Sequence, residues 1–239
     1  MKLSEAKYNK VSNIETHNTG KGLQRVVVYV VAFAFHFSLF TSAFAVAQTD
    51  TTALRIHSLQ PIPLVSGVAL GGAGTLLTFQ PEINRLAVSL HDDVVAANLP
   101  QMSADDYIQY LPAIAPVALN LCGLHSRHPL GRMMMLEGGS YLLGAGWLNA
   151  LKYGIGVERP DNSRFNSFPS GHTFVAFTGA ELIRREYGEE YPWVAVAGYA
   201  VAIAVGAMRI YNDRHWLGDV LAGAGLGIMS ITLVYWALD

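Results

Sequence analysis

Long apolar stretches alternate with short polar segments from about residue 63 to the end of the chain. Several of these stretches are shorter than the roughly 20 residues that a helix needs to cross a bilayer at a right angle. They are rich in Gly and Ala, which let helices approach one another closely in lipid. No stretch has the strict alternation of a half-buried strand. The pattern therefore predicts an all-α fold, a polytopic bundle of membrane helices. The apolar stretches are Pro63–Phe79, Tyr107–Gly123, Met133–Leu151, His172–Ile183, Trp193–Met208 and Trp216–Leu238.

The first 47 residues carry a different pattern. Several lysines and one arginine precede the apolar run Val26–Ala47, which ends in SAFAVAQ. A positive flank, an apolar core and an A-x-A pattern are typical of a secretory signal peptide. Because the run is nearly long enough to span a bilayer, an uncleaved anchor is the alternative. We predict a signal peptide or N-terminal anchor over residues 1–47 and one domain over residues 48–239, with Gln48 outside the cytoplasm.

Composition narrows the class of protein. Charged residues make up 14% of the chain, against about 25% in soluble domains. The formal net charge of −2 and the lack of a basic stripe argue against nucleic acid as a partner. Cys122 stands alone in an apolar stretch, so we expect a buried thiol and neither a disulfide framework nor a thiolate metal site.

Lys and Arg also predict orientation, because loops that stay in the cytoplasm are enriched in them. Four arginines between apolar stretches would face the cytoplasm, and the polar segments 152–171 and 209–214 would then lie outside. If Gln48 is outside, the two polar segments can lie outside only if Pro63–Phe79 does not cross the membrane completely. We expect it to pack along the bundle or at its outer surface. The four arginines are Arg127, Arg132, Arg184 and Arg185.

Three polar segments carry candidate chemistry. The first is Lys152, six residues and then Arg159-Pro160; the second is Pro169-Ser170-Gly171-His172 before an apolar run. A helix that starts at Ser170-Gly171 would offer free backbone N–H groups and a positive dipole end to an anion. Guanidinium groups match the geometry of phosphate oxygens. Together these segments predict a site for a phosphate-like anion.

The third segment contains Arg209, His215 and Asp219. His215 and Asp219 are four residues apart, so they share one face at the start of a helix. A carboxylate there can hold one ring nitrogen and leave the other as a base or a nucleophile. His172 is placed as a second acid or base. An ordinary helix cap and membrane-flanking cations explain each segment alone, but not all three in this order.

The three segments resemble the signature of the type 2 phosphatidic acid phosphatase (PAP2) family, K-x6-R-P, P-S-G-H and S-R-x5-H-x3-D. One position departs from it, since Met208 stands where the family has Ser. The resemblance implies a six-helix core, with the first motif after helix three, the second opening helix four and the third between helices five and six. It covers the chain from about Pro63 to the C-terminus.

The resemblance also implies roles. His215 would attack phosphorus and form a phosphohistidine, Asp219 would orient it, and His172 would protonate the leaving oxygen and then activate water. Lys152, Arg159, Arg209, Ser170 and the Gly171 amide would hold the phosphoryl oxygens. The family needs no metal, and we expect no cofactor. Met208 would tune activity without abolishing it.

The expected function is that of a metal-independent lipid phosphatase in a bacterial inner membrane, with its site facing the periplasm and a phosphorylated membrane lipid as its partner. The chain resembles the lipid A phosphatases of the family most. Undecaprenyl diphosphate, phosphatidylglycerol phosphate and phosphatidate remain alternative substrates. A periplasmic non-specific acid phosphatase and a transporter or lipid-binding protein with a degenerate site are alternative classes.

Overall fold

The computed structural model describes residues 61–96 and 100–239, and the signal peptide or anchor predicted for residues 1–47 lies outside them. The described residues form helices joined by turns and loops, without a strand, which confirms the all-α prediction. The helices are α2 (Pro61–Phe79), α3 (Pro81–Ala96), α4 (Asp105–Ile108), α5 (Leu111–Leu121), α6 (Leu130–Ile155), α7 (Gly171–Tyr187), α8 (Pro192–Tyr211) and α9 (Leu217–Leu238).

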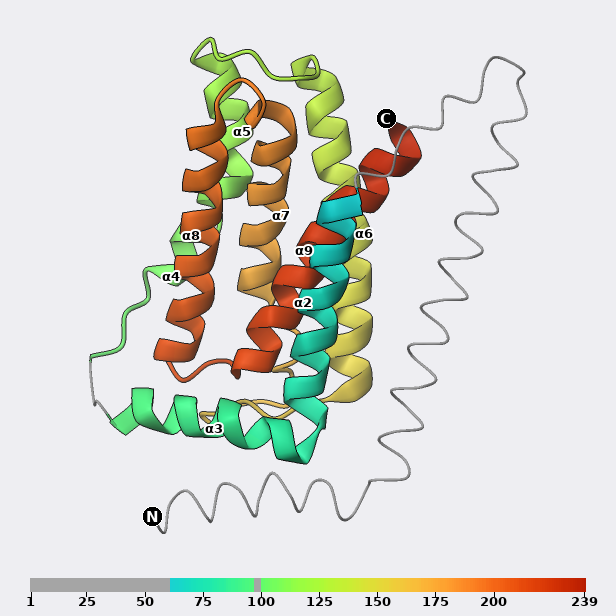
Figure 1. Cartoon of the computed structure of the whole chain (residues 1–239). Coiled ribbons are helices and arrows are strands. Elements are labelled where there is room, and N and C mark those ends of the chain that lie inside the picture. Colours follow the sequence, from blue (N-terminus) through green and yellow to red (C-terminus); the bar gives the residue numbers. More distant parts are fainter. Residues whose placement is uncertain (1–60, 97–99) are drawn as a thin grey trace.

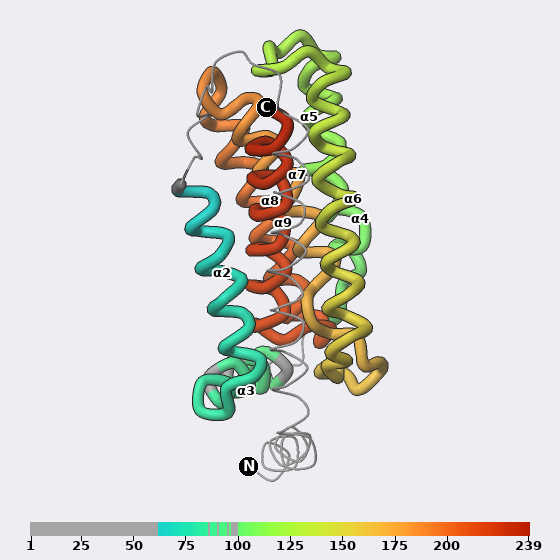
Figure 2. The backbone as a smooth tube through the Cα atoms, turned by 90° about the vertical axis from the view of Figure 1, so that its right-hand side faces the viewer, coloured from blue at the N-terminus to red at the C-terminus, as the bar shows by residue number. Residues whose placement is uncertain are grey.

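The long helices lie lengthwise in one bundle, and α3 lies across one end of it (Figure 1). Helix α9 packs against α2, α6 and α7, so it occupies the middle of the bundle (Figure 2). Among the described helices, α2, α8 and α9 are long and apolar enough to cross a membrane. Helix α9 is mostly buried, whereas α2 and α8 expose large apolar side chains such as Val65 and Val196. Such side chains suit contact with lipid.

Helix α2 differs from expectation. It is 19 residues long and lies against α9, so its length does not agree with a segment that stops short of a full crossing. Glycine makes the close packing possible, because a Cβ on Gly74 would come within 2.4 Å of the Ala222 backbone nitrogen. Hence α2 does pack along the bundle, as predicted, but over a length sufficient for a span.

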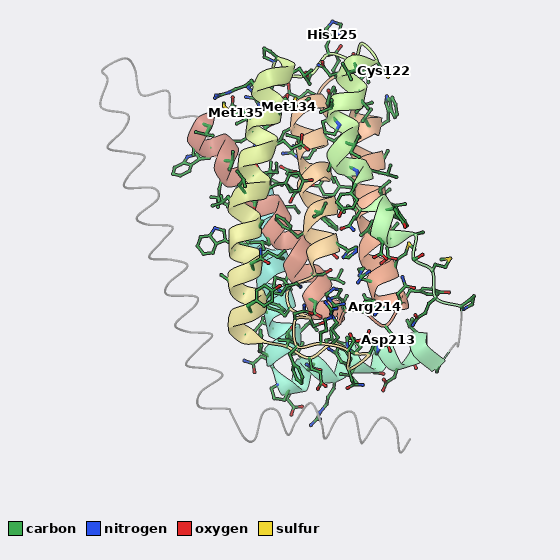
Figure 3. All side chains as sticks on the ribbon, turned by 180° about the vertical axis from the view of Figure 1, so that it is seen from behind. Cys122, His125, Met134, Met135, Asp213 and Arg214 are labelled. Carbon is green, nitrogen blue, oxygen red and sulfur yellow. The ribbon has the colours of Figure 1, made fainter. Side chains whose placement is uncertain are left out.

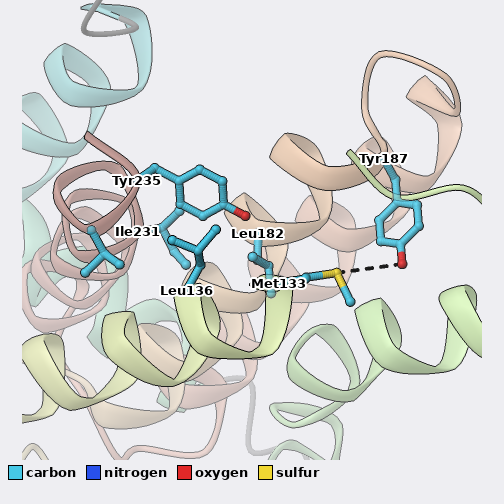
Figure 4. Packing of buried hydrophobic residues seen from close by; sticks show 7 residues of the cluster. Met133, Leu136, Leu182, Tyr187, Ile231 and Tyr235 are labelled. Carbon is cyan, nitrogen blue, oxygen red and sulfur yellow. Dashed lines mark hydrogen bonds between the residues drawn. The ribbon is translucent and has the colours of Figure 1, made fainter. Parts of the chain in front are cut away.

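A buried apolar cluster ties α6, α7 and α9 together in the half of the bundle away from α3 (Figure 4). Met133 and Leu136 of α6 contact Leu182 of α7 and Ile231 of α9. Each of these side chains is at most 2% exposed, and burial of such a side chain contributes about 1.5–3 kcal/mol. The cluster holds the three helices whose other ends carry the motifs.

Among the described helices, those that run lengthwise in the bundle are, in chain order, α2, α5, α6, α7, α8 and α9, with α3 and α4 between α2 and α5. This order agrees with the implied six-helix core. Lys152 lies in the last turn of the third, Ser170 caps the fourth, and the Arg209–Asp219 segment joins the fifth and sixth. Figure 3 shows Asp213 and Arg214 of that segment at one end and Cys122 at the other. Cys122 is exposed, so the expectation of a buried thiol is wrong; it lies just past the C-terminus of α5, not inside it.

Candidate active site

The turn before α7 forms the helix start that the Pro-Ser-Gly-His motif predicts. Ser170 is the N-cap residue, with an extended backbone, and its Oγ accepts a hydrogen bond from Thr173 Oγ1 at 2.9 Å. Gly171 is the first residue of the helix. The N–H groups of a first helical turn have no partner within the helix and attract anions. Ser170 therefore caps the helix here, while the turn itself provides the anion-binding geometry.

Lys152 and Arg159 both make hydrogen bonds to neutral oxygens. Lys152 Nζ donates to the Pro169 carbonyl oxygen at 2.7 Å, which places the ammonium beside the turn that leads into α7. Arg159 Nε donates to Asn166 Oδ1 at 2.9 Å within the loop between α6 and α7. Neither of these bonds neutralises the positive charge, so both cations can still attract an anion.

Arg209 lies in the last turn of α8 and is only 5% exposed. One of its terminal nitrogens forms a short ion pair with Asp105 and lies 3.4 Å from Asp106 Oδ1. Its Nε is buried and has no hydrogen-bond partner among the described residues. A buried guanidinium nitrogen without a partner is costly.

His215 and Asp219 form a buried pair with Ser167. His215 Nδ1 lies 3.4 Å from Asp219 Oδ2 and 3.4 Å from Ser167 Oγ. Ser167 Oγ donates a short hydrogen bond to Asp219 Oδ2, which also accepts from the Trp216 backbone N–H at 2.9 Å. The carboxylate is therefore fixed on the Nδ1 side of the ring, and Nε2 remains free of that network.

His172, the second residue of α7, is partly exposed. Its Nε2 lies 2.9 Å from Asp106 Oδ1. Asp106 belongs to the short helix α4, on a segment that contains none of the three motifs. The ring thus lies at the surface of the site, in contrast to the buried ring of His215, which is 1% exposed.

Charged residues of the different motifs shift one another's pKa values. Burial, with Lys152 and Arg209 adding to it, lowers the pKa of His215 to about 4 against the opposing effect of Asp219. Burial and then Arg209 lower the pKa of His172, although Asp106 partly offsets them. Burial and Arg209 also lower the pKa of Arg159. Hydrogen bonds from Lys152 to the Pro169 carbonyl oxygen and from the Ser170 backbone N–H to the Asp219 carbonyl oxygen join the three predicted motifs in space.

Sequence reasoning did not identify four polar residues of this region. Asp105 and Asp106 contact Arg209 and His172, and Ser167 contacts Asp219. Asn212 donates to Asp105 Oδ1 at 2.9 Å. An acidic pair just before an apolar stretch is visible in the sequence, but its pairing with residues more than 60 positions away has no local signature.

Metal binding has little support from the side chains. Within residues 61–96 and 100–239, no group of three or more His, Cys, Asp and Glu side chains is arranged to hold a metal ion. The cationic side chains around the turn before α7 favour an anionic ligand instead.

Comparison with known proteins agrees with the motifs. A family model described as the PAP2 superfamily matches residues 135–239. A lipid A 1-phosphatase of Porphyromonas gingivalis is 39% identical over 168 residues, which cover 70% of this chain and 37% of that protein. A lipid A 1-phosphatase of Helicobacter pylori is 38% identical over 77 residues, 32% of this chain and 38% of that protein. The chain thus spans well under half the length of these curated relatives.

One solved structure was also found, a transmembrane PAP2 type phosphatidylglycerolphosphate phosphatase from Bacillus subtilis. It is 21% identical, and the superposition covers 90% of this chain and 94% of that chain with a TM-score of 0.40. A score this low does not establish a common arrangement of helices. The family model is the stronger finding, because it contains every motif of the site from Lys152 to Asp219. Residues 135–239 form a PAP2 superfamily domain.

Proposed function

We propose that this chain is a membrane lipid phosphatase that hydrolyses a phosphate ester through a phosphohistidine on His215. The observation that carries the proposal is the combination of a buried His215–Asp219–Ser167 network with cations whose hydrogen bonds go to neutral oxygens. Such a site can hold a phosphoryl group and supply a nucleophile to it.

His215 is suited to attack. Its pKa of about 4 leaves the ring neutral near pH 7, and Asp219 and Ser167 lie on the Nδ1 side. Nε2 would donate its lone pair to phosphorus as the bond from phosphorus to the leaving oxygen breaks. The positive charge that develops on the ring is stabilised by the Asp219 carboxylate.

His172 would give its proton to the leaving oxygen. In the second step it would take a proton from water while the water oxygen attacks phosphorus and the P–N bond breaks. This restores neutral His215 and releases inorganic phosphate. Lys152, Arg159 and Arg209, with the N–H groups at the start of α7, would bind the non-bridging oxygens in both steps.

The substrate proposal rests on the relatives. Two of them are lipid A 1-phosphatases, so we propose a phosphate group of lipid A as the first substrate to test. Undecaprenyl diphosphate, phosphatidate and phosphatidylglycerol phosphate are the alternatives within the same chemistry. In the described part of the chain, three helices are long and apolar enough to cross a membrane, which favours a lipid over a soluble ester.

We also propose that the site faces the periplasm from the inner membrane. Gln101 lies at the site end, since its Nε2 donates to the Asn212 carbonyl oxygen at 3.4 Å. A reporter fused after Gln101 should therefore report an external location. Because α2 is long and apolar enough to cross, this orientation places Gln48 on the cytoplasmic side, which differs from the expectation drawn from the sequence. A cytoplasmic signal from this fusion contradicts the proposed orientation.

The experiment that tests the activity uses the purified full chain in detergent or vesicles. Phosphate release is measured from lipid A, undecaprenyl diphosphate, phosphatidate and phosphatidylglycerol phosphate, with p-nitrophenyl phosphate as a soluble ester. We expect release from at least one lipid and its loss in His215→Asn. Release from the soluble ester alone would favour a non-specific acid phosphatase, and no release from any substrate contradicts the proposal.

A further inference from the structure

The carboxylate of Asp106 occupies an unusual position in the candidate site. Its Oδ1 lies 2.9 Å from His172 Nε2 and 3.4 Å from a terminal nitrogen of Arg209. One anionic oxygen thus bridges the proposed general acid and a proposed phosphate-binding guanidinium. Asp106 comes from α4, far from the three motifs in the chain.

A bound phosphate ester would need the same two contacts. The proton donor must reach an oxygen on phosphorus, and Arg209 must reach an oxygen of the same phosphoryl group. An oxygen that already touches both groups therefore stands where an oxygen of the phosphoryl group would lie. His172 Nε2 cannot donate to Asp106 and to a leaving oxygen with one proton at the same time, so Asp106 must move when that nitrogen serves the substrate.

The neighbouring carboxylate shows why such a movement is feasible. Asp105 is 1% exposed and is held by Arg209 and by Asn212, so it anchors α4 in the bundle. The Asp106 side chain is 55% exposed, and a rotation would place it in water without moving the helix. Ion pairs to a side chain this exposed are weak, because water screens the charges and competes for them.

We infer that Asp106 is an internal competitor of the phosphate, an anion supplied by the protein that occupies the empty site and leaves when a phosphoryl group enters. The inference rests on the proposed function, because it assigns the same site. The consequence applies to many ligands, because a competitor weakens the binding of every anion that needs these contacts by the same factor. Product phosphate and the phosphodiester groups of surrounding lipids would all bind more weakly than they do without Asp106.

The test compares Asp106→Asn with Asp93→Asn, which removes one carboxylate from an exposed position on α3. The two variants make the same change in net charge, and neither side chain is buried, so neither substitution threatens the core. Binding of inorganic phosphate is measured by calorimetry, and inhibition by orthovanadate and the substrate KM are measured by phosphate release.

We expect Asp106→Asn to bind phosphate and orthovanadate about two- to fivefold more tightly than the wild type, with a KM lowered by a similar factor. Asp93→Asn should match the wild type. Unchanged or weaker phosphate binding in Asp106→Asn overturns the inference. So does a fall in kcat with a shifted pH profile at constant phosphate affinity, because that result identifies Asp106 as a positioning residue for His172.

The same measurements separate this inference from the proposed function. A wild-type protein that releases phosphate from a lipid while Asp106→Asn gains no affinity contradicts the inference alone. A wild-type protein that neither binds phosphate nor releases it contradicts the proposed function, and the inference is then rejected with it.

Discussion

Both halves of the bundle bury charge and histidine, but they pair that charge differently. In the half away from α3, Glu181 accepts from Arg184 Nε at 2.7 Å, from Arg185 Nε at 2.8 Å and from the Tyr199 hydroxyl at 2.6 Å. His128 contacts Glu186 at 2.8 Å through one ring nitrogen. In that half, cations and carboxylates face each other directly.

At the site end, the cations have different hydrogen-bond partners. Lys152 and Arg159 donate to a carbonyl and an amide oxygen. Arg209 does pair with Asp105 through a terminal nitrogen, but its Nε has no partner among the described residues. A charge pair that is complete stabilises one arrangement, whereas cations bonded to neutral oxygens retain attraction for a further anion. The type of partner, and not the number of buried charges, thus distinguishes a structural network from a ligand site.

The largest expected effect tests the site half directly. His215→Asn removes the proposed nucleophile and should lower kcat by at least about 1,000-fold, because no other group in the network can form the phosphorus–nitrogen bond. Phosphate release from the preferred lipid measures it. His125→Asn, an exposed histidine at the opposite end, should keep wild-type activity. Substantial turnover in His215→Asn would mean that the two halves do not differ in function as proposed.

Glu181→Gln tests the other half. The substitution leaves the buried guanidinium of Arg185 without its carboxylate, so the free energy of unfolding should fall by about 3–5 kcal/mol. Denaturant unfolding in detergent, followed by circular dichroism, measures the change. Activity per folded molecule should stay the same.

Glu82→Gln is the matched control for that experiment. Glu82 pairs with Arg85 at 3.2 Å on the exposed face of α3, and loss of such a pair should change the free energy of unfolding by less than about 1 kcal/mol. Equal losses from the two substitutions would show that the buried network is not structural.

Arg159→Gln should raise KM by about 10- to 100-fold, since it removes a charge-assisted hydrogen bond to the phosphoryl group. Steady-state kinetics on the preferred lipid would show it. Arg164→Gln removes the same charge from an exposed position in the same loop and should change KM by less than about threefold. Similar effects from both variants would indicate that the loop attracts the substrate through its overall charge, and not through a direct contact between Arg159 and the phosphoryl group.

The pH profile distinguishes the two histidines. His215 must be neutral to attack, and its pKa of about 4 keeps it neutral above that pH. His172 must carry a proton, and its pKa is lowered from 6.5, so the protonated fraction falls before neutral pH. We expect kcat/KM to be highest between these limits and to fall about tenfold per pH unit on the alkaline side. A profile that rises through pH 7 contradicts these roles.

The smallest effect concerns the one departure from the family signature. Met208→Ser restores the hydroxyl and should change kcat/KM by less than about threefold, because Arg209 and the turn before α7 supply the main contacts. Phosphate release measures this variant as well. A gain above about tenfold would show that the methionine weakens the site.

The sequence alone could predict those parts of the site that depend on local signals. The apolar stretches and the caps around them locate the ends of α6, α7 and α9, and Lys152, Ser170 and His215 lie at or beside those ends. The spacing of His215 and Asp219 predicts their contact, because four residues make one turn.

Contacts between distant segments could not be predicted in this way. Asp106 reaches His172 across 66 positions, and Ser167 reaches Asp219 across 52. These pairs depend on how α4 and the loop before α7 pack against the bundle. The local spacing of apolar and polar residues does not specify that packing. The expectation for Pro63–Phe79 was limited for a related reason, since the packing of α2 along α9 over its full 19 residues is a contact between distant segments.

The backbone N–H of Ser170 donates to the carbonyl oxygen of Asp219 at 2.9 Å, and a Cβ on Gly223 would come within 2.4 Å of the Ser170 carbonyl oxygen. The anion-binding turn and the start of α9 are therefore joined through main-chain atoms, independently of their side chains. The two halves of the site cannot separate while α7 and α9 remain packed. Thermal inactivation should consequently coincide with loss of the fold, so residual activity would serve as a direct measure of the fraction of folded protein.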